Sequence, residues 1–311
     1  MPDSTTTRSA GPNQHAALGV AFSLGVLYIV WGSTYLAIKV AVETIPPYSM
    51  LAFRFLVAGG LLYLYLLFRG APNPTRAEWL GSVRIGSFLL VGGMGSVTLA
   101  ESMGVSSGVA AVVVSTMPLW FAFFARFWGE RISLSEWSGM ILGLSGVVIL
   151  NAEANLAANP AAAALLFLAP ISWALGSVWS RSLLQPSGLM ASAAQMLTAG
   201  AVFIPIALLR GESMMQVPSL SSSVALVYLI TFGSLLAYSA YIYLLSRSVR
   251  PAVLSSYAYV NPVVAVLLGV GLAGENLTVG GLMGVGIILL GVVLAVMTKA
   301  KGESKQTTLQ E

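Results

Sequence analysis

The chain has 311 residues, of which 57% are hydrophobic and 8% are charged, and its formal net charge is +4. A soluble domain carries roughly 25% charged residues, so this composition excludes a soluble globular protein and predicts an all-α membrane protein. The absence of cysteine excludes a disulfide framework and a thiolate metal site.

Apolar runs of transmembrane length follow a polar N-terminal segment. We expect residues 1–16 to form a disordered cytoplasmic tail and residues 299–311 to form a second cytoplasmic tail. Between them, the apolar runs predict ten transmembrane helices. The expected spans are 17–40, 48–68, 83–100, 106–127, 136–151, 160–183, 189–209, 223–245, 252–273 and 279–298.

The positions of Lys and Arg predict the orientation of these spans. With the N-terminus in the cytoplasm, only Lys39 and Arg210 fall on the outer side, and Arg54 lies within a span. Because cytoplasmic loops are enriched in Lys and Arg, we expect both termini in the cytoplasm. The expected location is a bacterial-type inner membrane. The cationic residues that then lie on the cytoplasmic side are Arg8, Arg69, Arg76, Arg84, Arg126, Arg131, Arg181, Arg247, Arg250, Lys299, Lys301 and Lys305.

The two halves of the chain repeat one pattern. SGVAAVVVSTMP at 107–118 is followed by GERIS at 129–133, and RPAVLSSYAYVNP at 250–262 is followed by GENLT at 274–278. Five spans make one unit, and five is odd, so the second unit must enter the membrane from the opposite face. The sequence therefore predicts two inverted five-helix repeats, over 17–151 and 160–298, as in many secondary transporters. The alternative is that the duplication reflects ancestry only.

These residues also carry a family resemblance. The stretch AVVVSTMPLWFAFFARFWGERISLSEWSGMILGLSGVVIL resembles the fourth and fifth helices of an EamA-type domain in the drug/metabolite transporter superfamily, and SSYAYVNPVVAVLLGVGLAGENLTVGGLMGVGIILLGVVL resembles a second copy. WGSTYLAIKV with PPYSMLAFRFLVAGG resembles the two opening helices of that family, so the likeness covers 18–298. The resemblance implies a ten-helix basket with a central cavity, and export of metabolites, including aromatic and other amino acids.

Aromatic residues predict what lines such a cavity. Tyr28, Trp31 and Tyr35 recur at i, i+3 and i+7 and so share one helix face. Trp31 and Trp173 lie near the middle of spans that correspond in the two units, away from the interfaces where Trp is common. An aromatic-lined cavity would suit apolar or aromatic cargo. The alternative is that these rings only pack between helices or face lipid.

Two prolines and their polar neighbours are further candidates. Pro118 and Pro262 interrupt the hydrogen bonding of their helices, which predicts kinks at these positions. Polar groups near the kinks are the remaining substrate-binding candidates, and the alternative is a purely structural kink. They are Ser115, Tyr257, Tyr259 and Asn261.

Arg54 is the basic residue that lies well inside a span, and intramembrane ionisable residues are functional candidates. It is expected to attract a substrate carboxylate, to extend outward to the membrane surface, or to fasten an outer gate with Glu43 or Glu101. Lys39 is expected to be a solvated or gate residue. No carboxylate is expected mid-span, so transport is not expected to depend on a buried carboxylate.

The sequence contains no ATP-binding GxxxxGK[ST] motif and no metal-binding or nucleophilic constellation. We therefore expect no enzyme activity, no cofactor and no nucleic-acid partner. The expected function is secondary transport by alternating access, with export of small metabolites such as amino acids through the lipid bilayer. Export of drugs or other amphipathic compounds, an uptake permease and a passive channel are the alternatives. The sequence leaves the oligomeric state open and is compatible with a monomer.

Overall fold

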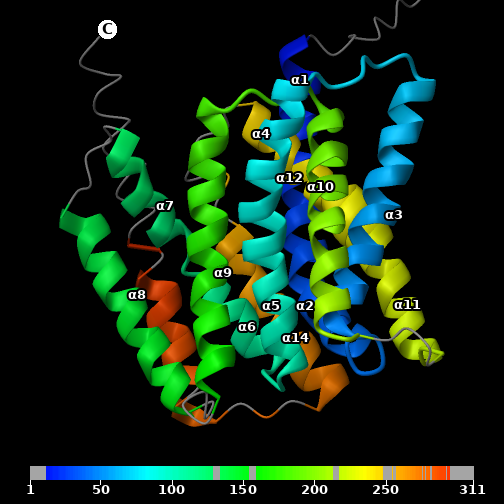
Figure 1. Ribbon diagram of the computed structural model, residues 1–311. Coiled ribbons are helices and arrows are strands. Elements are labelled where there is room, and N and C mark those ends of the chain that lie inside the picture. Colours follow the sequence, from blue (N-terminus) through cyan, green and yellow to red (C-terminus); the bar gives the residue numbers. More distant parts are fainter. Residues whose placement is uncertain are drawn as a thin grey trace, which may run out of the picture.

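In the computed structural model of the protein, the regular elements among the described residues are all helical (Figure 1). The described residues are 12–128, 134–153, 159–212, 217–247, 254, 257–274, 276, 278–280, 282–291 and 293–294. The tail at 299–311 and residues 1–11 of the N-terminal tail lie outside them, as do Arg131, Arg250 and the three C-terminal lysines. The expected tail is too long, because helix α1 (Pro12–Val26) already begins at Pro12, and proline is favoured in the first turn of a helix.

Four helical stretches precede α8 (Leu134–Glu153) in the first half. Helix α1 continues through the π-helical segment η1 (Leu27–Trp31) into α2 (Gly32–Ala41), and α3 covers Pro47–Phe68. Helix α4 (Arg76–Gly86) continues through the π-helical segment η2 (Ser87–Gly95) into α5 (Ser96–Ser102). The fourth stretch is divided into α6 (Ser107–Val114) and α7 (Met117–Ala125), which is followed by the short helix η3 (Arg126–Trp128).

Helix α8 (Leu134–Glu153) leads to the second half. There, α9 (Pro160–Trp179) ends in the short helix η5 (Ser180–Ser182), and α10 covers Leu189–Leu209. Helix α11 (Leu220–Tyr228), the π-helical segment η6 (Leu229–Tyr238) and α12 (Ser239–Ser246) form one continuous stretch, called the α11–α12 helix below. Helix α14 (Tyr257–Ala273) and an apolar helix over Leu282–Gly291 complete the described chain.

Seven helices among the described residues are long and apolar enough to cross a membrane. They correspond to seven of the ten expected spans. The expected spans 136–151, 252–273 and 279–298 are helical over α8, α14 and Leu282–Gly291, but none of these three is among the seven. The structure therefore supports a multi-pass helical membrane protein, and the count of ten spans stays a prediction.

The third expected span is longer than its apolar core. It begins at Arg76 rather than at residue 83 because Thr75 and Glu78 form a capping box. The Thr75 backbone N–H donates to the Glu78 carboxylate at 2.7 Å, and the Glu78 backbone N–H donates to the Thr75 hydroxyl at 3.3 Å. These bonds satisfy backbone donors at the start of the helix, so the helix extends into a charged segment that hydropathy alone excludes.

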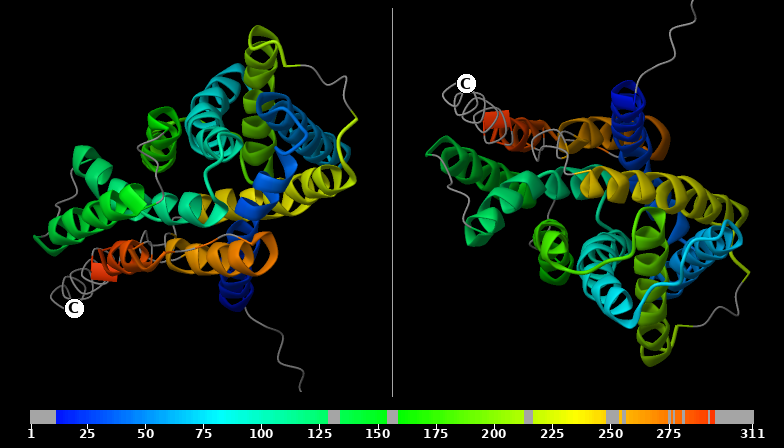
Figure 2. Two further views of the ribbon diagram at one scale, coloured as in Figure 1. Left: turned by 90° about the horizontal axis from the view of Figure 1, so that it is seen from below. Right: turned by 90° about the horizontal axis from the view of Figure 1, so that it is seen from above.

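Small residues allow α8 to lie against the helix at Leu282–Gly291, and both end-on views in Figure 2 show these two helices side by side. A Cβ atom on Gly291 would lie 2.5 Å from the Gly143 nitrogen, and one on Gly146 would lie 2.9 Å from the Gly284 carbonyl oxygen. The glycines therefore serve a close approach of two helices within one chain.

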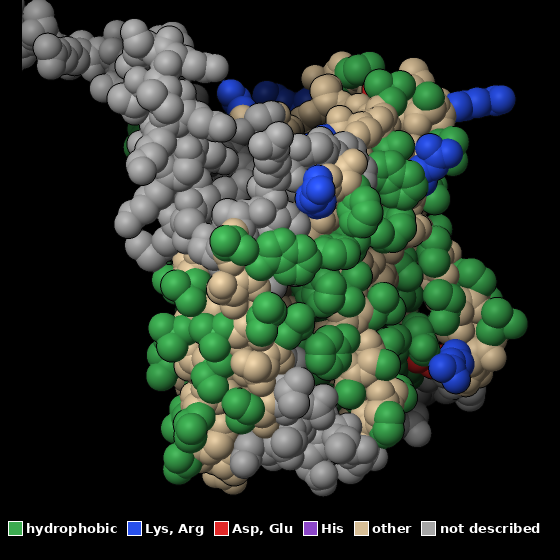
Figure 3. Space-filling model, turned by 90° about the vertical axis from the view of Figure 1, so that its left-hand side faces the viewer, with side chains coloured by type: hydrophobic (Ala, Val, Ile, Leu, Met, Phe, Trp, Pro, Cys, Tyr) green, Lys and Arg blue, Asp and Glu red, His purple; other side chains and the backbone are tan. Residues whose placement is uncertain are grey.

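The surface is apolar along the helices and basic at one end. In Figure 3, hydrophobic side chains cover the middle of the described surface, and most of the Lys and Arg side chains gather at the top. Large apolar side chains such as Ile29, Phe68 and Leu209 are exposed. An apolar band of this kind suits contact with lipid rather than with water.

Candidate substrate site

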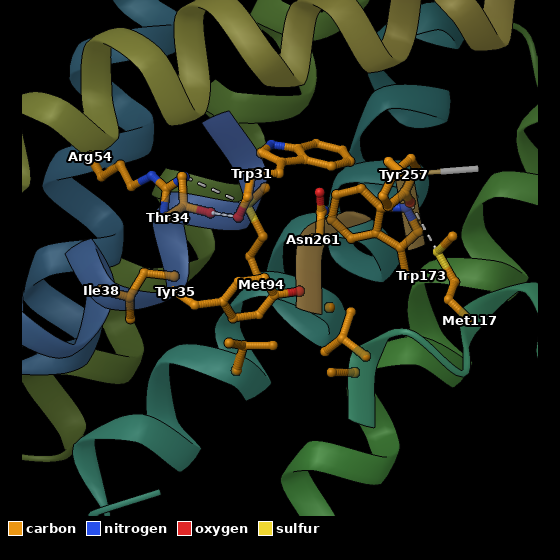
Figure 4. A pocket seen from close by; sticks show the side chains of 14 residues that line it. Trp31, Thr34, Tyr35, Ile38, Arg54, Met94, Met117, Trp173, Tyr257 and Asn261 are labelled. Atoms are coloured by element: carbon orange, nitrogen blue, oxygen red, sulfur yellow. Dashed lines mark hydrogen bonds between the residues drawn. The ribbon is translucent and has the colours of Figure 1, made fainter. Parts of the chain in front are cut away.

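A cavity lies between helices that are far apart in the sequence. Its wall includes residues of η1, α2, α3, η2, α7, α9 and α14, and the empty space between them, including its open side, is about 550 Å³. It extends from Trp31 at the end of η1 along α2, past Tyr35 to Ile38, toward the end of the bundle where α2 ends. Figure 4 shows Arg54, Thr34 and Met94 at one side of the cavity and Trp173 and Tyr257 at the other.

Four aromatic rings, Trp31, Trp173, Tyr241 and Tyr257, form an aromatic cluster at the inner side of the cavity. The ring of Trp31 lies 5.3 Å from that of Trp173, and it lies 5.2 Å from each of the two tyrosine rings. The Trp31–Trp173 and Trp31–Tyr257 pairs are edge-to-face, an arrangement that aromatic quadrupoles favour. Trp31, Trp173 and Tyr257 line the cavity, so the structure brings these three predicted residues together.

Gly93 in η2 determines where the Trp173 ring lies. A Cβ atom on Gly93 would lie 2.7 Å from Cε3 of that ring, which is closer than carbon atoms normally approach. Ser172, the neighbour of Trp173, donates a hydrogen bond of 2.7 Å to the carbonyl oxygen of Phe88 in the same long helix. The π-helical segment and its glycine thus position one wall of the aromatic cluster.

The middle of the α1–α2 helix is held by side-chain hydrogen bonds to its carbonyl groups. Thr34 donates to the Trp31 carbonyl oxygen at 2.7 Å, and Ser33 donates to that of Val30 at 2.8 Å. With its amide nitrogen facing them, Asn261 donates to the carbonyl oxygens of Leu27 at 3.1 Å and Tyr28 at 3.2 Å. Asn261 lines the cavity and joins α14 to η1.

Pro262 itself does not interrupt α14, which is continuous from Tyr257 to Ala273. Asn261, the polar residue next to Pro262, donates from its amide to carbonyl oxygens of η1 rather than of its own helix. Near Pro118 the helix is interrupted, since α6 ends at Val114 and α7 begins at Met117. Ser115 and Thr116 donate there to the carbonyl oxygens of Val112 at 2.6 Å and Val113 at 2.8 Å.

Arg54 lies on α3 at the cavity wall and is only 1% exposed. Its Nε donates to the Ser234 hydroxyl at 2.8 Å, and its Nη2 lies 3.8 Å from the Met94 sulfur. Its Nη1 is buried and has no hydrogen-bond partner. A Cβ atom on Gly233 would lie 2.9 Å from Nη2, so the glycine leaves room for the guanidinium group. The side chain does not extend to solvent.

The other gate candidates lie outside the cavity wall. Glu101 is buried in α5, 3% exposed, and it interacts electrostatically with Tyr35, which lines the cavity. Lys39 is half-buried in the last turn of α2. Among the described residues no group of three or more His, Cys, Asp or Glu could hold a metal ion.

Three predicted substrate-binding residues are not placed in the cavity. Ser115 is buried and bonded to Val112, while Tyr28 is half-buried and is not part of the wall. Tyr28 and Trp31 both lie in η1, and the widened π-helical turn there means that a spacing of three residues no longer places two side chains on one face. The side chain of Tyr259 lies outside the described residues.

Sequence reasoning missed Tyr241 and Ser234 of the α11–α12 helix. Tyr241 is completely buried in the aromatic cluster, and its hydroxyl is hydrogen-bonded to that of Ser177 at 2.7 Å. Tyr238, also completely buried, donates to Gln195 on α10. The i, i+3 spacing of the two tyrosines in an apolar span was the available signal. Nothing in the sequence connected Ser234 with Arg54.

Comparison with known proteins places the chain among membrane transporters. The model of the EamA-like transporter family matches residues 18–152 and, a second time, residues 160–297. The chain is 47% identical over 277 residues to the uncharacterized inner membrane transporter YedA of Escherichia coli K12, covering 89% of this chain and 90% of that protein. It is 27% identical over 289 residues to a probable amino-acid metabolite efflux pump of Salmonella typhimurium, covering 87% of this chain and 92% of that protein.

A crystal structure of a protein with 20% sequence identity superposes with a TM-score of 0.65 and covers 90% of this chain and 98% of that one. At this identity the likeness concerns the fold. The two family matches together cover most of the sequence, and they agree with the apolar helices described above. The protein is a multi-pass membrane transporter and not an enzyme, and it belongs to the EamA-like transporter family.

Proposed function

We propose that the protein exports small metabolites, above all amino acids including aromatic ones, by alternating access at the central cavity. The observation that carries this proposal is the aromatic cluster beside a cavity in the middle of the bundle. Flat rings offer stacking surface to an apolar or aromatic side chain, and polar groups on the same wall can fix the orientation of a headgroup. The name of the Salmonella relative supports amino-acid metabolites as the cargo.

The buried polar residues beyond the aromatic cluster support alternating access. Toward the end of the bundle where α2 ends, the cavity continues past Tyr35 to Ile38. On the other side of the aromatic cluster, Ser177, Gln195 and Tyr238 are completely buried and hydrogen-bonded. A carrier needs such a closed side in each of its states, whereas a channel needs an open path at both ends.

Reconstitution into liposomes tests the proposal. Purified protein is supplied with labelled amino acids and, separately, with cationic dyes, and exchange against an unlabelled internal pool is measured. We expect counterflow of aromatic amino acids, and a loss of roughly 10-fold in apparent affinity in Trp31→Ala and Trp173→Ala, since each removes one stacking surface. Trp137→Ala is the matched control because Trp137 is 44% exposed on α8. Unchanged exchange of every substrate in both cavity variants would remove the aromatic cluster from the site.

A further inference from the structure

The guanidinium group of Arg54 has more hydrogen-bonding capacity than the protein uses. A guanidinium carries five N–H donors in a planar fork, and it stays charged. The structure gives it one hydroxyl acceptor, Ser234, and one weak sulfur acceptor, Met94. Its Nη1 donors are buried without a partner in a side chain that is 1% exposed. A buried cation left in this condition is costly to the fold unless something else binds it.

No acidic side chain of the protein neutralises this charge among the described residues. None of the residues that line the cavity is acidic, and Arg54 forms no ion pair there. Glu101 is the buried acid near the cavity, and it does not line the cavity wall as Arg54 does. Glu43, the other expected partner, is exposed at the end of the first hairpin. The missing negative charge is therefore not supplied from within the described part of the chain.

The guanidinium lies within reach of the space that a substrate would fill. In Figure 4 the side chain extends along the cavity wall toward Thr34 and Met94, opposite the rings of Trp173 and Tyr257. Three π-helical segments contribute to this arrangement, since Trp31 ends η1, Met94 lies in η2, and Ser234 lies in η6. An anion at Arg54 would thus have an apolar, aromatic surface beside it in the same cavity.

We propose that Arg54 binds the carboxylate of the substrate, that this contact is the main determinant of specificity, and that the preferred ligands are aryl-alkyl carboxylates whether or not they carry an ammonium group. Arg–carboxylate pairs are strong and directional in buried sites. The cavity wall offers no carboxylate to an ammonium group, so the amine of an amino acid contributes less than its carboxylate. This inference rests on the proposed function, in that the same cavity is the transport site.

Binding to the purified protein in detergent tests the inference without requiring transport. The probes are 3-phenylpropanoate, phenylalanine and 2-phenylethylamine, which share one ring and differ in their charged groups. A ligand that binds the folded state raises the temperature of unfolding. We expect 3-phenylpropanoate and phenylalanine to raise it in a concentration-dependent way and 2-phenylethylamine to have little effect. Equal or stronger stabilisation by the amine would overturn the inference, as would the absence of binding by both carboxylates.

Substitution of Arg54 tests whether this residue binds the carboxylate. Arg54→Met keeps the length of the side chain without its charge, and we expect the carboxylates to bind roughly 10- to 100-fold more weakly. Arg54→Lys keeps the charge without the fork and should give an intermediate loss. Arg210→Gln, which removes an exposed arginine at the end of α10, is the control and should bind as the wild type does. Unchanged carboxylate binding in Arg54→Met overturns the inference, and if that variant does not fold, Arg54→Lys and the three wild-type ligands still decide it.

Counterflow in liposomes separates this inference from the proposed function. If carboxylates bind through Arg54 but no probe is exchanged, the inference stands and the proposal that the protein transports these compounds is refuted. If phenylalanine is exchanged but the amine competes as well as 3-phenylpropanoate does, transport stands and the role of Arg54 fails.

Discussion

Replacing Gly93 with alanine should displace Trp173 without altering any ring of the aromatic cluster. The added Cβ atom would lie 2.7 Å from Cε3 of the indole, whereas non-bonded carbon atoms prefer about 3.5–4.0 Å. The ring must therefore retreat by roughly 1 Å. It is confined by the rings of Trp31 and Tyr241, each 5.3 Å away. Overpacking of this kind costs about 1–3 kcal/mol of folding free energy.

A second glycine provides the control for this loss of stability. Gly60 on α3 has no atom within 4 Å of its ideal Cβ position, so Gly60→Ala should gain only the helix propensity of alanine, up to about 1 kcal/mol. Thermal or denaturant unfolding in detergent should place Gly93→Ala about 1–3 kcal/mol below Gly60→Ala. Phenylalanine exchange should fall in the first variant and not in the second.

A double-mutant cycle decides whether the indole is the cause. Trp173→Ala alone removes a large buried ring and should cost about 3–5 kcal/mol. In that background the added Cβ of Gly93→Ala meets no ring, so its penalty should disappear and the two substitutions should be non-additive. Equal destabilisation by Gly93→Ala in both backgrounds would refute the reasoning.

Three further predictions concern the frame of the bundle. The Glu212 carboxylate accepts hydrogen bonds from the backbone N–H groups of Tyr48 at 3.1 Å and Ser49 at 2.7 Å, at the start of α3. Glu212→Gln should therefore lower the free energy of unfolding by about 1–2 kcal/mol. The control Glu43→Gln, at an exposed position, should leave it unchanged. Tyr241→Phe should cost about 1 kcal/mol through the lost Ser177 hydrogen bond but keep ligand affinity, because the ring stays in place; a large loss of affinity would contradict this. Single cysteines introduced at each terminus of this cysteine-free chain should react with membrane-impermeant reagents only from the cytoplasmic side, and labelling of the two termini from opposite sides would remove the predicted inverted symmetry.

The boundaries of the apolar spans were predictable because hydropathy and helix length follow from the bilayer itself. The expected span 189–209 coincides with α10, and 160–183 differs by one residue from α9 and η5 together. The third span was placed too late, since a capping box rather than hydropathy starts that helix. Local hydrogen bonding of this kind extends helices beyond their apolar part.

The site was only partly predictable because its geometry depends on contacts across the chain. Trp31 and Trp173 were found from their mid-span positions, and they do meet. Tyr28 was grouped with them by assuming a regular helix, but η1 changes the register there. The contact of Arg54 with Ser234 joins residues separated by 180 positions, and no local pattern encodes it.

The α11–α12 helix is tied to its neighbours along its whole length. Ser222 donates to the Val40 carbonyl oxygen, Tyr228 is bonded to Ser33, Ser234 to Arg54, and Tyr241 to Ser177. Tilting this helix would break several of these hydrogen bonds at once. We therefore expect the α11–α12 helix to stay in place while other helices move. The α6–α7 stretch lines another side of the same cavity. It can bend where the helix is interrupted, between Val114 and Met117. The motion that admits or releases substrate should then be concentrated at the junction of α6 and α7. Distances between spin labels should change more across α6–α7 than along the α11–α12 helix.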